Sequence, residues 1–342
     1  MDDFVVEGRA TTIVGEAVSA SEGYIGRVDL DNRPLLRPGE ILETVPGLIA
    51  TQHSGSGKAN QYFLRGFNLD HGTDFATFVD GMPVNMVSHG HGQGYTDLNF
   101  LIPETVELLA YQKGSYDAQS GDFTGAGSAR IQTSDIRESG LASLSLGEHN
   151  SQRALVIDTL EIGHSNLLFA LERELNDGPW ELDENLDKIN GLLKFSHQHQ
   201  NDRLAIGFMG YDSTWNSTDQ IPVRAITQNR IRPSGFLDPT VGGESSRYSL
   251  NASWERNNTQ ASTRLSAYSI YYDMDLWSNF TYFLEDPIDG DQFEQVDRRF
   301  IYGFSATHSL ENREFFQRSA RHYFGLGRMS SAISRMKGCS SP

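Results

Sequence analysis

The 342-residue sequence predicts an α+β domain followed by the antiparallel strands of an incomplete membrane β-barrel. Three observations lead to this fold class. Residues 1 to about 136 are rich in glycine and hold short apolar runs bounded by turn residues. From Leu141 onward, apolar and polar residues alternate with a period of two. The connections between the alternating runs are short at one end and long at the other, which is typical of outer-membrane barrels.

Composition narrows the classes of function. The chain carries 45 acidic and 28 basic residues, a formal net charge of −17, whereas a nucleic-acid groove needs a cationic face. The one cysteine, Cys339, has no partner for a disulfide. No run approaches the ~18 apolar residues of a membrane helix, but β-barrels remain possible because their strands have a polar face. No enzyme motif is complete, so we expect neither catalysis nor a cofactor.

The elements of the first domain are predicted from the Pro-Gly and Asp-Gly pairs that bound its apolar runs. Residues 40–45 lie between Pro38-Gly39 and Pro46-Gly47, which predicts one short helix with acidic residues near its positive end. Asp80-Gly81 joins two apolar runs, and Asp-Gly favours the left-handed positions of a hairpin turn. Short strands are predicted at residues 48–50, 62–65, 76–79 and 106–111.

The alternating region predicts about eight strands. Short turns are expected near residues 163–165, 198–202 and 257–258, and long loops at 176–185, 212–244 and 273–297. About eight strands enclose only their own side chains, and a barrel that holds a folded domain needs roughly 22. The barrel is therefore expected to be incomplete. The strands are placed near residues 141–147, 153–162, 166–175, 187–197, 203–211, 246–255, 261–272 and 298–308.

The two ends of the sequence differ from the rest. The start lacks the basic and apolar regions of a secretory signal, so either the protein stays inside the cell or its signal is missing from this sequence. Residues 311–342 hold six basic and two acidic residues, a net charge of +4, and we assign them to an atypical basic tail. Two interpretations of this tail fit equally: a frame-shifted or truncated end, and a genuine basic tail.

Residues 40–135 resemble the plug domain of TonB-dependent outer-membrane receptors. The resemblance rests on short motifs in the order that the family shows: Ile41-Leu42 with Val45-Pro46-Gly47-Leu48, Leu64-Arg65-Gly66-Phe67, Val79-Asp80-Gly81-Met82-Pro83, Ile102-Pro103-Glu104-Thr105-Val106-Glu107 with Lys113-Gly114, and Gly125-Ala126-Gly127-Ser128-Ala129-Arg130-Ile131. It implies a TonB-box-like segment at 1–10, a plug at 30–136 and the first part of the barrel at 140–310. Ser115 departs from the pattern because a proline often follows Lys-Gly there, and Ser128-Ala129-Arg130 replaces the usual apolar strand.

The resemblance also implies a function. The intact protein would lie in the outer membrane of a Gram-negative bacterium, in contact with its lipid, and would take up a scarce nutrient such as a ferric siderophore or another metal complex. A TonB-type energising protein would add a strand to the box at Asp3, Phe4, Val5 and Val6. Arg65, beside a flexible glycine, is expected to anchor the plug to the barrel by pairing with carboxylates.

Histidines mark the candidate binding loops of the first domain. His89 and His91 lie in a glycine-spaced loop, and neutral imidazole is a good ligand for zinc, copper, nickel and iron. We therefore name these two as candidate metal ligands, with hydrogen bonding inside the loops as the alternative. The candidate ligand contacts, inferred from their places between strands, are His53, Asn60, His71, His89, His91 and Tyr95.

Two other interpretations of the sequence predict different behaviour. One is a soluble or surface ligand-binding module in which the glycine-rich α+β domain precedes a β-sandwich. The other is a first domain that folds independently while the rest of the chain stays unstructured. A barrel fragment differs from both because its open edge strands carry unpaired backbone groups and would aggregate without detergent.

Overall fold

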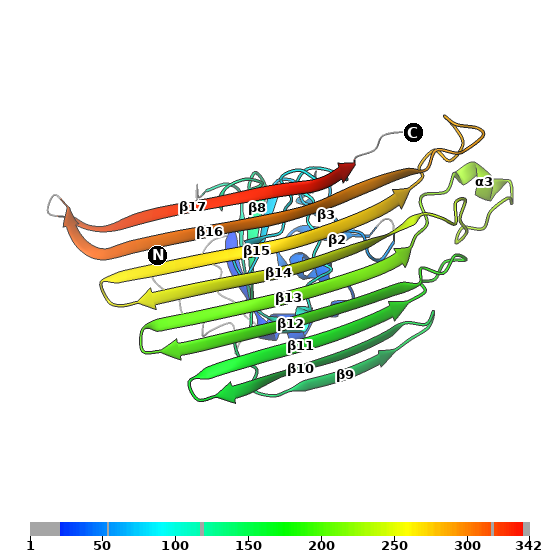
Figure 1. Cartoon of the computed structure of the whole chain (residues 1–342). Coiled ribbons are helices and arrows are strands. Elements are labelled where there is room, and N and C mark those ends of the chain that lie inside the picture. Colours follow the sequence, from blue (N-terminus) through cyan, green and yellow to red (C-terminus); the bar gives the residue numbers. More distant parts are fainter. Residues whose placement is uncertain (1–20, 53–54, 117–119, 316–317, 338–342) are drawn as a thin grey trace.

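The computed structural model describes residues 21–52, 55–116, 120–315 and 318–337, with side chains described outside 311–321. The TonB-box-like segment, His53 and Cys339 lie outside these residues. The chain forms two layers: an N-terminal domain packs against one face of a wide sheet, behind it in the view of Figure 1. Among the described residues, no helix is long and apolar enough to cross a membrane.

The N-terminal domain is a compact α+β unit. It begins with β1 (Glu22–Gly26) and the short helix α2 (Arg27–Asp31). The predicted helix is a 3-10 helix, η1 (Pro38–Thr44), and a second one, η2 (Pro103–Thr105), follows later. Asp80 and Gly81 form the predicted turn, with φ angles of 47° and 81°.

Two small sheets organise this domain. The larger sheet has the order β1-β7-β8-β5-β6, in which β5 and β8 run parallel. Its further strands are β5 (Phe75–Val79), β6 (Met82–Pro83), β7 (Val106–Lys113) and β8 (Gly127–Thr133). The smaller sheet contains β2 (Leu48–Thr51), β3 (Gln61–Leu64) and β4 (Phe67–Asn68).

The wide sheet has nine strands, and each pairs antiparallel with its neighbours in sequence. The eight predicted strands are all present in it. A ninth strand, β17, lies in the segment that we assigned to a basic tail. This serine- and arginine-rich segment pairs antiparallel with β16. The strands are β9 (Leu141–Leu146), β10 (Gln152–Ile162), β11 (Ser165–Asn176), β12 (Leu186–His199), β13 (Asp202–Asn216), β14 (Gly242–Asn257), β15 (Ala261–Ser278), β16 (Phe293–Phe315) and β17 (Arg318–Lys337).

The sheet is open, since β9 and β17 form its two edges among the described residues. The described strands therefore do not close into a barrel. They also form a single sheet whose inner face is covered by the N-terminal domain. No second sheet packs on its outer face in the described part of the chain, so the β-sandwich alternative is wrong.

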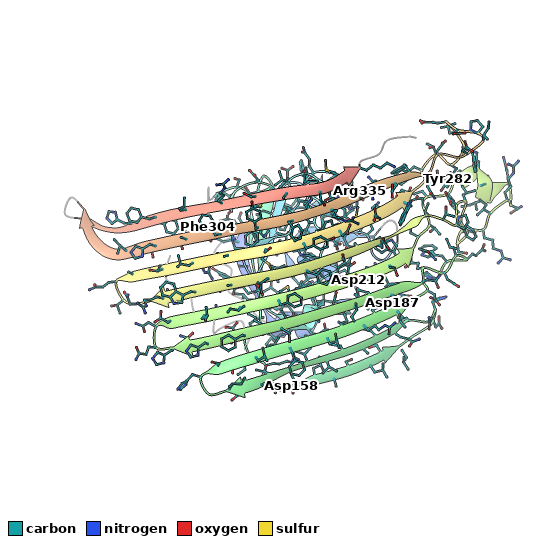
Figure 2. The ribbon with its side chains drawn as sticks, viewed as in Figure 1. Asp158, Asp187, Asp212, Tyr282, Phe304 and Arg335 are labelled. Carbon is teal, nitrogen blue, oxygen red and sulfur yellow. The ribbon has the colours of Figure 1, made fainter. Side chains whose placement is uncertain are left out.

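The two faces of the wide sheet differ chemically, as the alternation predicted. Along β14, Ser249 is 2% exposed on the inner face, and its neighbour Leu250 is 53% exposed on the outer face. Figure 2 shows the side chains of the sheet, with the acidic Asp187 and Asp212 toward the end that bears the long loops. Apolar residues that stay exposed on the outer face include Leu144, Val156, Leu171, Leu193, Phe208, Leu250 and Phe300.

The two ends of the sheet have different connections. We name the end with the connections 163–164, 200–201 and 258–260 the short-turn rim. The end with the loops 177–185, 217–241 and 279–292 is the long-loop rim, and the second loop holds helix α3 (Val223–Thr227). Among the described connections, only the short one between β9 and β10 departs from this division.

Candidate functional site

Two loops of the N-terminal domain approach the long-loop rim. The first contains Gly55 and Gly57, which lie against the indole of Trp215 on β13. A Cβ at Gly57 would be 2.0 Å from Cε3 of that indole, so only glycine fits. Ser56 of the same loop hydrogen-bonds to Glu184, which precedes β12. This loop is therefore held directly by the inner face and the rim of the sheet.

The second loop, between β6 and η2, carries His89, His91 and Tyr95. With His71, from the connection between β4 and β5, they form a histidine–tyrosine cluster. The His89 and Tyr95 rings are stacked with centroids 4.1 Å apart, and the His71 and His91 rings meet edge-on at 4.5 Å. The side chains of the predicted loops thus converge. A stacked pair and an edge-on pair are both favourable arrangements for aromatic rings.

This cluster is tied to β15 and β16. Because Nδ1 of His89 accepts the backbone N–H of His91 at 3.0 Å, its proton lies on Nε2, which donates to the Tyr272 hydroxyl at 3.2 Å. His91 Nδ1 donates to Gln295 Oε1 at 2.9 Å. The Gly90 N–H donates to Asp297 Oδ2 at 3.1 Å. Three consecutive residues of one loop therefore contact three side chains of the sheet.

Burial sets the protonation of the cluster. It lowers the pKa of His89 well below its ordinary value, and the nearby Arg299 cation lowers it further. Burial also raises the pKa of Tyr95 well above its usual range, with the charge of Asp97 adding to the effect. Both side chains are consequently neutral at physiological pH. The stacked His89–Tyr95 pair is therefore an uncharged contact between the domain and the sheet.

The candidate ligand residues are more buried than their loop positions suggested. Asn60, His71, His89 and Tyr95 are between 1% and 8% exposed, and His91 is partly exposed. His71 Nδ1 donates to the carbonyl oxygens of Ala59 and Asn60, each at 3.1 Å. These side chains hold the loops together, and their contact with a ligand stays a prediction.

Metal ligation by His89 and His91 also stays a prediction. Within the described ranges, no group of three or more histidine, cysteine, aspartate or glutamate side chains is arranged to hold a metal ion. Both ring nitrogens of His89 are engaged in hydrogen bonds, one to the His91 N–H and one to Tyr272. A metal at His89 would have to replace one of them.

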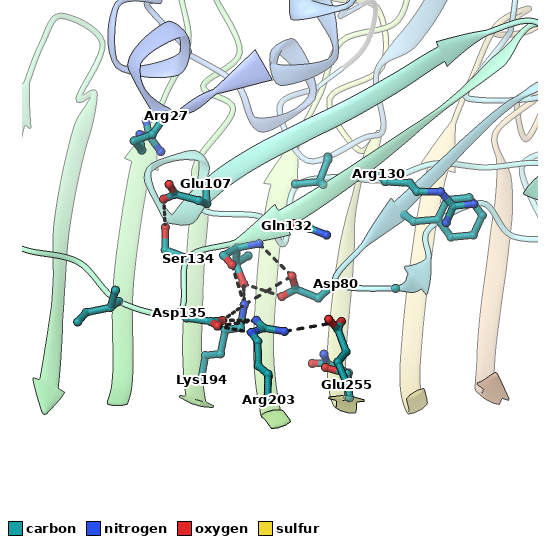
Figure 3. A pocket seen from close by; sticks show the side chains of 18 of the residues that line it. Arg27, Asp80, Glu107, Arg130, Gln132, Ser134, Asp135, Lys194, Arg203 and Glu255 are labelled. Carbon is teal, nitrogen blue, oxygen red and sulfur yellow. Dashed lines mark hydrogen bonds and ion pairs between the residues drawn. The ribbon is translucent and has the colours of Figure 1, made fainter. Parts of the chain in front are cut away.

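A cavity lies near the short-turn rim (Figure 3). It has a volume of about 1010 Å³ and lies between the domain and the inner face of β12 to β16. Asp135, at the end of the domain, forms two hydrogen bonds of 2.7 Å with Arg203 and lies 3.0 Å from Lys194 Nζ. Lys194 also donates to the carbonyl oxygen of Thr133 at 2.6 Å and lies 3.8 Å from Asp80. We call Asp80, Asp135, Lys194 and Arg203 the anchor cluster.

A related contact joins the domain to β10 and β11. Arg153 donates to both carboxylate oxygens of Glu104, at 2.6 and 2.8 Å, and to Glu172 at 2.5 Å. Burial alone would raise the pKa of the Glu104 carboxyl, but the hydrogen bonds and charge of Arg153 outweigh it and lower that pKa. The same balance holds for Asp135, where burial is outweighed by Lys194 and Arg203, so its pKa is lowered. Both carboxylates therefore stay charged and paired.

The anchors observed differ from the one that we predicted. Arg65 is exposed at a turn with a φ of 53°, and in the described part of the chain no hydrogen bond or ion pair links its side chain to the sheet. Its predicted anchoring role is not supported by a contact, and it stays a prediction. Glu104 and Asp135 were missed, although Glu104 lies in the quoted Pro103-Glu104-Thr105 motif. The signal that could have identified Glu104 as an anchor is its position directly after Pro103, which holds the backbone of that turn rigid.

Known proteins agree with this architecture. Residues 15–128 match the family model described as the TonB-dependent Receptor Plug Domain. The solved structures that resemble the chain include the ferric citrate transporter FecA in its unliganded form (TM-score 0.71, 13% identity, 94% of this chain and 50% of that chain). The siderophore receptor PiuA from Acinetobacter baumannii (0.69, 13%, 93% and 47%) and the copper transporter OprC (0.69, 15%, 93% and 46%) are also similar.

Residues 15–128 thus match the plug domain of TonB-dependent receptors, and the chain as a whole shares the fold of the solved receptors that it resembles. Its described residues form a plug-type domain and nine antiparallel strands of an incomplete barrel, and the chain spans about half the length of the solved structures that it matches. The resemblance that we inferred from the sequence motifs is thereby confirmed, as is the predicted fold class. The N-terminal domain is therefore named the plug, and the nine strands are named the barrel sheet.

Proposed function

We propose that this chain is part of an outer-membrane receptor that takes up a ferric siderophore or another metal complex, with energy supplied by a TonB-type protein. The plug packed on the inner face of a sheet whose outer face is apolar is the observation that carries this proposal. Similar solved structures are described as a siderophore receptor, a ferric citrate transporter and a copper transporter, and each of these names concerns a metal or its chelate.

The outer membrane of a Gram-negative bacterium is the proposed location. Exposed aliphatic and aromatic side chains line the middle of the outer face, where lipid tails would cover them. The long-loop rim would face the exterior, since outer-membrane barrels have short periplasmic turns and longer external loops. Cargo would then arrive at the loops held by Trp215 and by the histidine–tyrosine cluster.

The energising step is proposed to act at the N-terminal segment. A TonB-type partner would pair its own strand with Asp3, Phe4, Val5 and Val6 by main-chain hydrogen bonds. The segment precedes β1, which pairs with β7 in the plug. Tension on the segment would therefore reach the plug sheet first, and the anchor cluster would resist its movement. We treat Val5→Pro as the test of this step, because proline removes an N–H and blocks strand pairing.

Ligand binding to the refolded chain tests the proposal. The chain would be refolded in detergent micelles and titrated with ferric citrate, a ferric tris-catecholate and Cu²⁺, with tryptophan fluorescence as the readout. We expect saturable quenching by at least one of these metal species and no quenching by metal-free citrate or free catechol. An equal response to metal-bound and metal-free ligands would contradict uptake of a metal complex. Replacing Tyr95 by Phe offers a matched variant at the predicted contact loops, and Tyr248→Phe on the outer face serves as its control.

Capture by the partner tests the second half of the proposal. A soluble periplasmic domain of a TonB-type protein should retain the refolded chain, and Val5→Pro should weaken this retention at least tenfold. Val18→Pro lies in the same terminal region but outside the proposed box, and it should leave retention unchanged. Equal retention of the wild type and Val5→Pro would exclude strand pairing at residues 3–6.

A further inference from the structure

The inner face of β14 is polar along most of its length. Ser245, Arg247, Ser249, Asn251 and Ser253 alternate along this face, whereas neighbouring β15 presents Ile270, Tyr272, Met274 and Leu276 at the corresponding height. Arg247 is 3% exposed and lies beneath the plug. The plug–sheet interface therefore contains the buried cation of Arg247.

One face of the Arg247 guanidinium is covered by an aromatic ring, and one of its edges has no hydrogen-bond partner among the described residues. Its Cζ atom lies 4.3 Å from the centroid of the Phe100 ring of the plug, which is a cation–π contact. Nε and Nη2 are both buried, and neither has a hydrogen-bond partner among the described residues. These two N–H groups lie side by side along one edge of the planar guanidinium. Together they match the two oxygens of a carboxylate.

Other arginines of the same chain use this edge for carboxylates. Arg203 holds Asp135 through Nε and Nη2, each at 2.7 Å. Arg256 holds the two oxygens of Asp202 in the same way, at 2.8 and 2.7 Å. Arg247 presents the same pair of donors, but it is more deeply buried than either. An unpaired buried guanidinium edge is costly, because its donors have lost water and gained nothing in exchange.

The groups around Arg247 leave this edge to an external partner. Asp97 of the plug is near enough for its charge to act on Arg247, yet no ion pair within 4.0 Å joins them in the described chain. One Asp97 oxygen instead accepts the N–H of Asn99 at 2.8 Å. Ser249 Oγ, on the same face as Arg247, is buried and also lacks a hydrogen-bond partner in that part of the chain. A hydroxyl without a partner thus lies two residues along the same face of β14.

We propose that the Nε–Nη2 edge of Arg247 is a binding site for a carboxylate group between the plug and the barrel sheet, with Ser249 as a third donor. The carboxylate can come from a free small acid or from a carboxylate-bearing metal chelate. Only the second source rests on the uptake function proposed above. The site lies behind Phe100, so a carboxylate reaches it when the plug moves relative to β14 or by diffusion along the polar face.

Calorimetric titration of the refolded chain in detergent micelles tests this site. Acetate is titrated at constant ionic strength, with chloride making up the balance, and citrate and ferric citrate follow. We expect saturable acetate binding in the wild type and at least a tenfold loss of affinity in Arg247→Met. Arg247→Lys retains the charge but not the two-pronged edge, so it should fall between the two. Arg173→Met removes an exposed arginine that is already paired with Asp187, and it should bind acetate as the wild type does.

The outcomes separate the site from the uptake function. Acetate binding that depends on Arg247, without any response to ferric citrate, would support the site and remove the carboxylate chelate as cargo. No saturable acetate binding in the wild type, or equal binding in wild type and Arg247→Lys, would overturn the site. Binding that emerges only in Asp97→Asn would show that Asp97 occupies the edge, and this too would overturn the proposal. Should Arg247→Met fail to fold, Arg247→Lys and Ser249→Ala carry the test.

Discussion

Replacing Asp135 by asparagine should loosen the plug from the barrel sheet. The substitution keeps the size of the side chain but removes the negative charge that pairs with Lys194 and Arg203. The Lys194 side chain is only 4% exposed, so its ammonium would be left in the interface with the more distant Asp80, 3.8 Å away. Removing one partner of a fully buried ion pair costs about 3–5 kcal/mol.

The expected cost for Asp135→Asn is smaller than that limit. The Asp135 side chain is 27% exposed, and Lys194 keeps its hydrogen bond to the Thr133 carbonyl oxygen. We therefore expect a loss of about 2 kcal/mol in the free energy of plug docking. This corresponds to a roughly 30-fold larger population of the undocked plug. Limited proteolysis of the chain in micelles measures that population when cleavage is slower than reclosing.

Two comparisons make this prediction refutable. Asp202→Asn breaks an exposed pair with Arg256 at the short-turn rim, and it should not change the rate of digestion. Adding Lys194→Met to Asp135→Asn should recover part of the loss, because it removes the uncompensated cation. Digestion of Asp135→Asn at the wild-type rate would refute the anchoring role. The Asp135 carboxyl has a lowered pKa, so its contribution to the free energy of plug docking is present above about pH 4. That contribution should be lost as the pH falls below this value.

Three further predictions concern other parts of the structure. Burial raises the pKa of Asp97 to about 6, so the free energy of unfolding should fall by about 3 kcal/mol as the pH rises from 4 through 6, and urea titrations of Asp97→Asn should lack this fall. Gly57→Ala should cost about 1–3 kcal/mol because its Cβ would overlap the Trp215 indole; Trp215→Leu should relieve the cost, and Gly191→Ala, with room for a Cβ, should be neutral in the same urea assay. Leu193→Arg, on the outer face midway along β12, should lower the yield of chain refolded into lipid vesicles and cost about 2–4 kcal/mol there, and an unchanged yield would argue against lipid contact.

Several features of the fold could be predicted because they depend on residues close in sequence. Alternation with a period of two identified the strands and separated Ser249 on the inner face from Leu250 on the outer face. The Asp80-Gly81 turn followed from the backbone preferences of these two residues alone. The strand β17 in the predicted tail was not predicted from the sequence, because its alternation is weak. Its pairing with β16 shows that it is a strand.

The pairing of charges across the plug–sheet interface could not be predicted in this way. Asp135 and Arg203 are 68 residues apart, and His89 and Tyr272 are 183 apart, so no local spacing relates them. Arg65 was chosen as an anchor because it lies beside a flexible glycine, yet the turn at Gly66 directs the chain to the surface. Similarly, the histidines of the plug loops were expected to face a ligand, but packing within the plug buries His71, and packing against β15 and β16 buries His89.

The sequence by itself determined the order of the strands, the two chemically distinct faces of the sheet and the class of receptor, because each is encoded in short patterns along the chain. Only the tertiary structure decided which carboxylates hold the plug and which cation is left with an open edge. Those properties depend on the register of strands and on the way the plug lies against them, so that Arg203 meets Asp135 while the equally capable Arg247 meets the ring of Phe100.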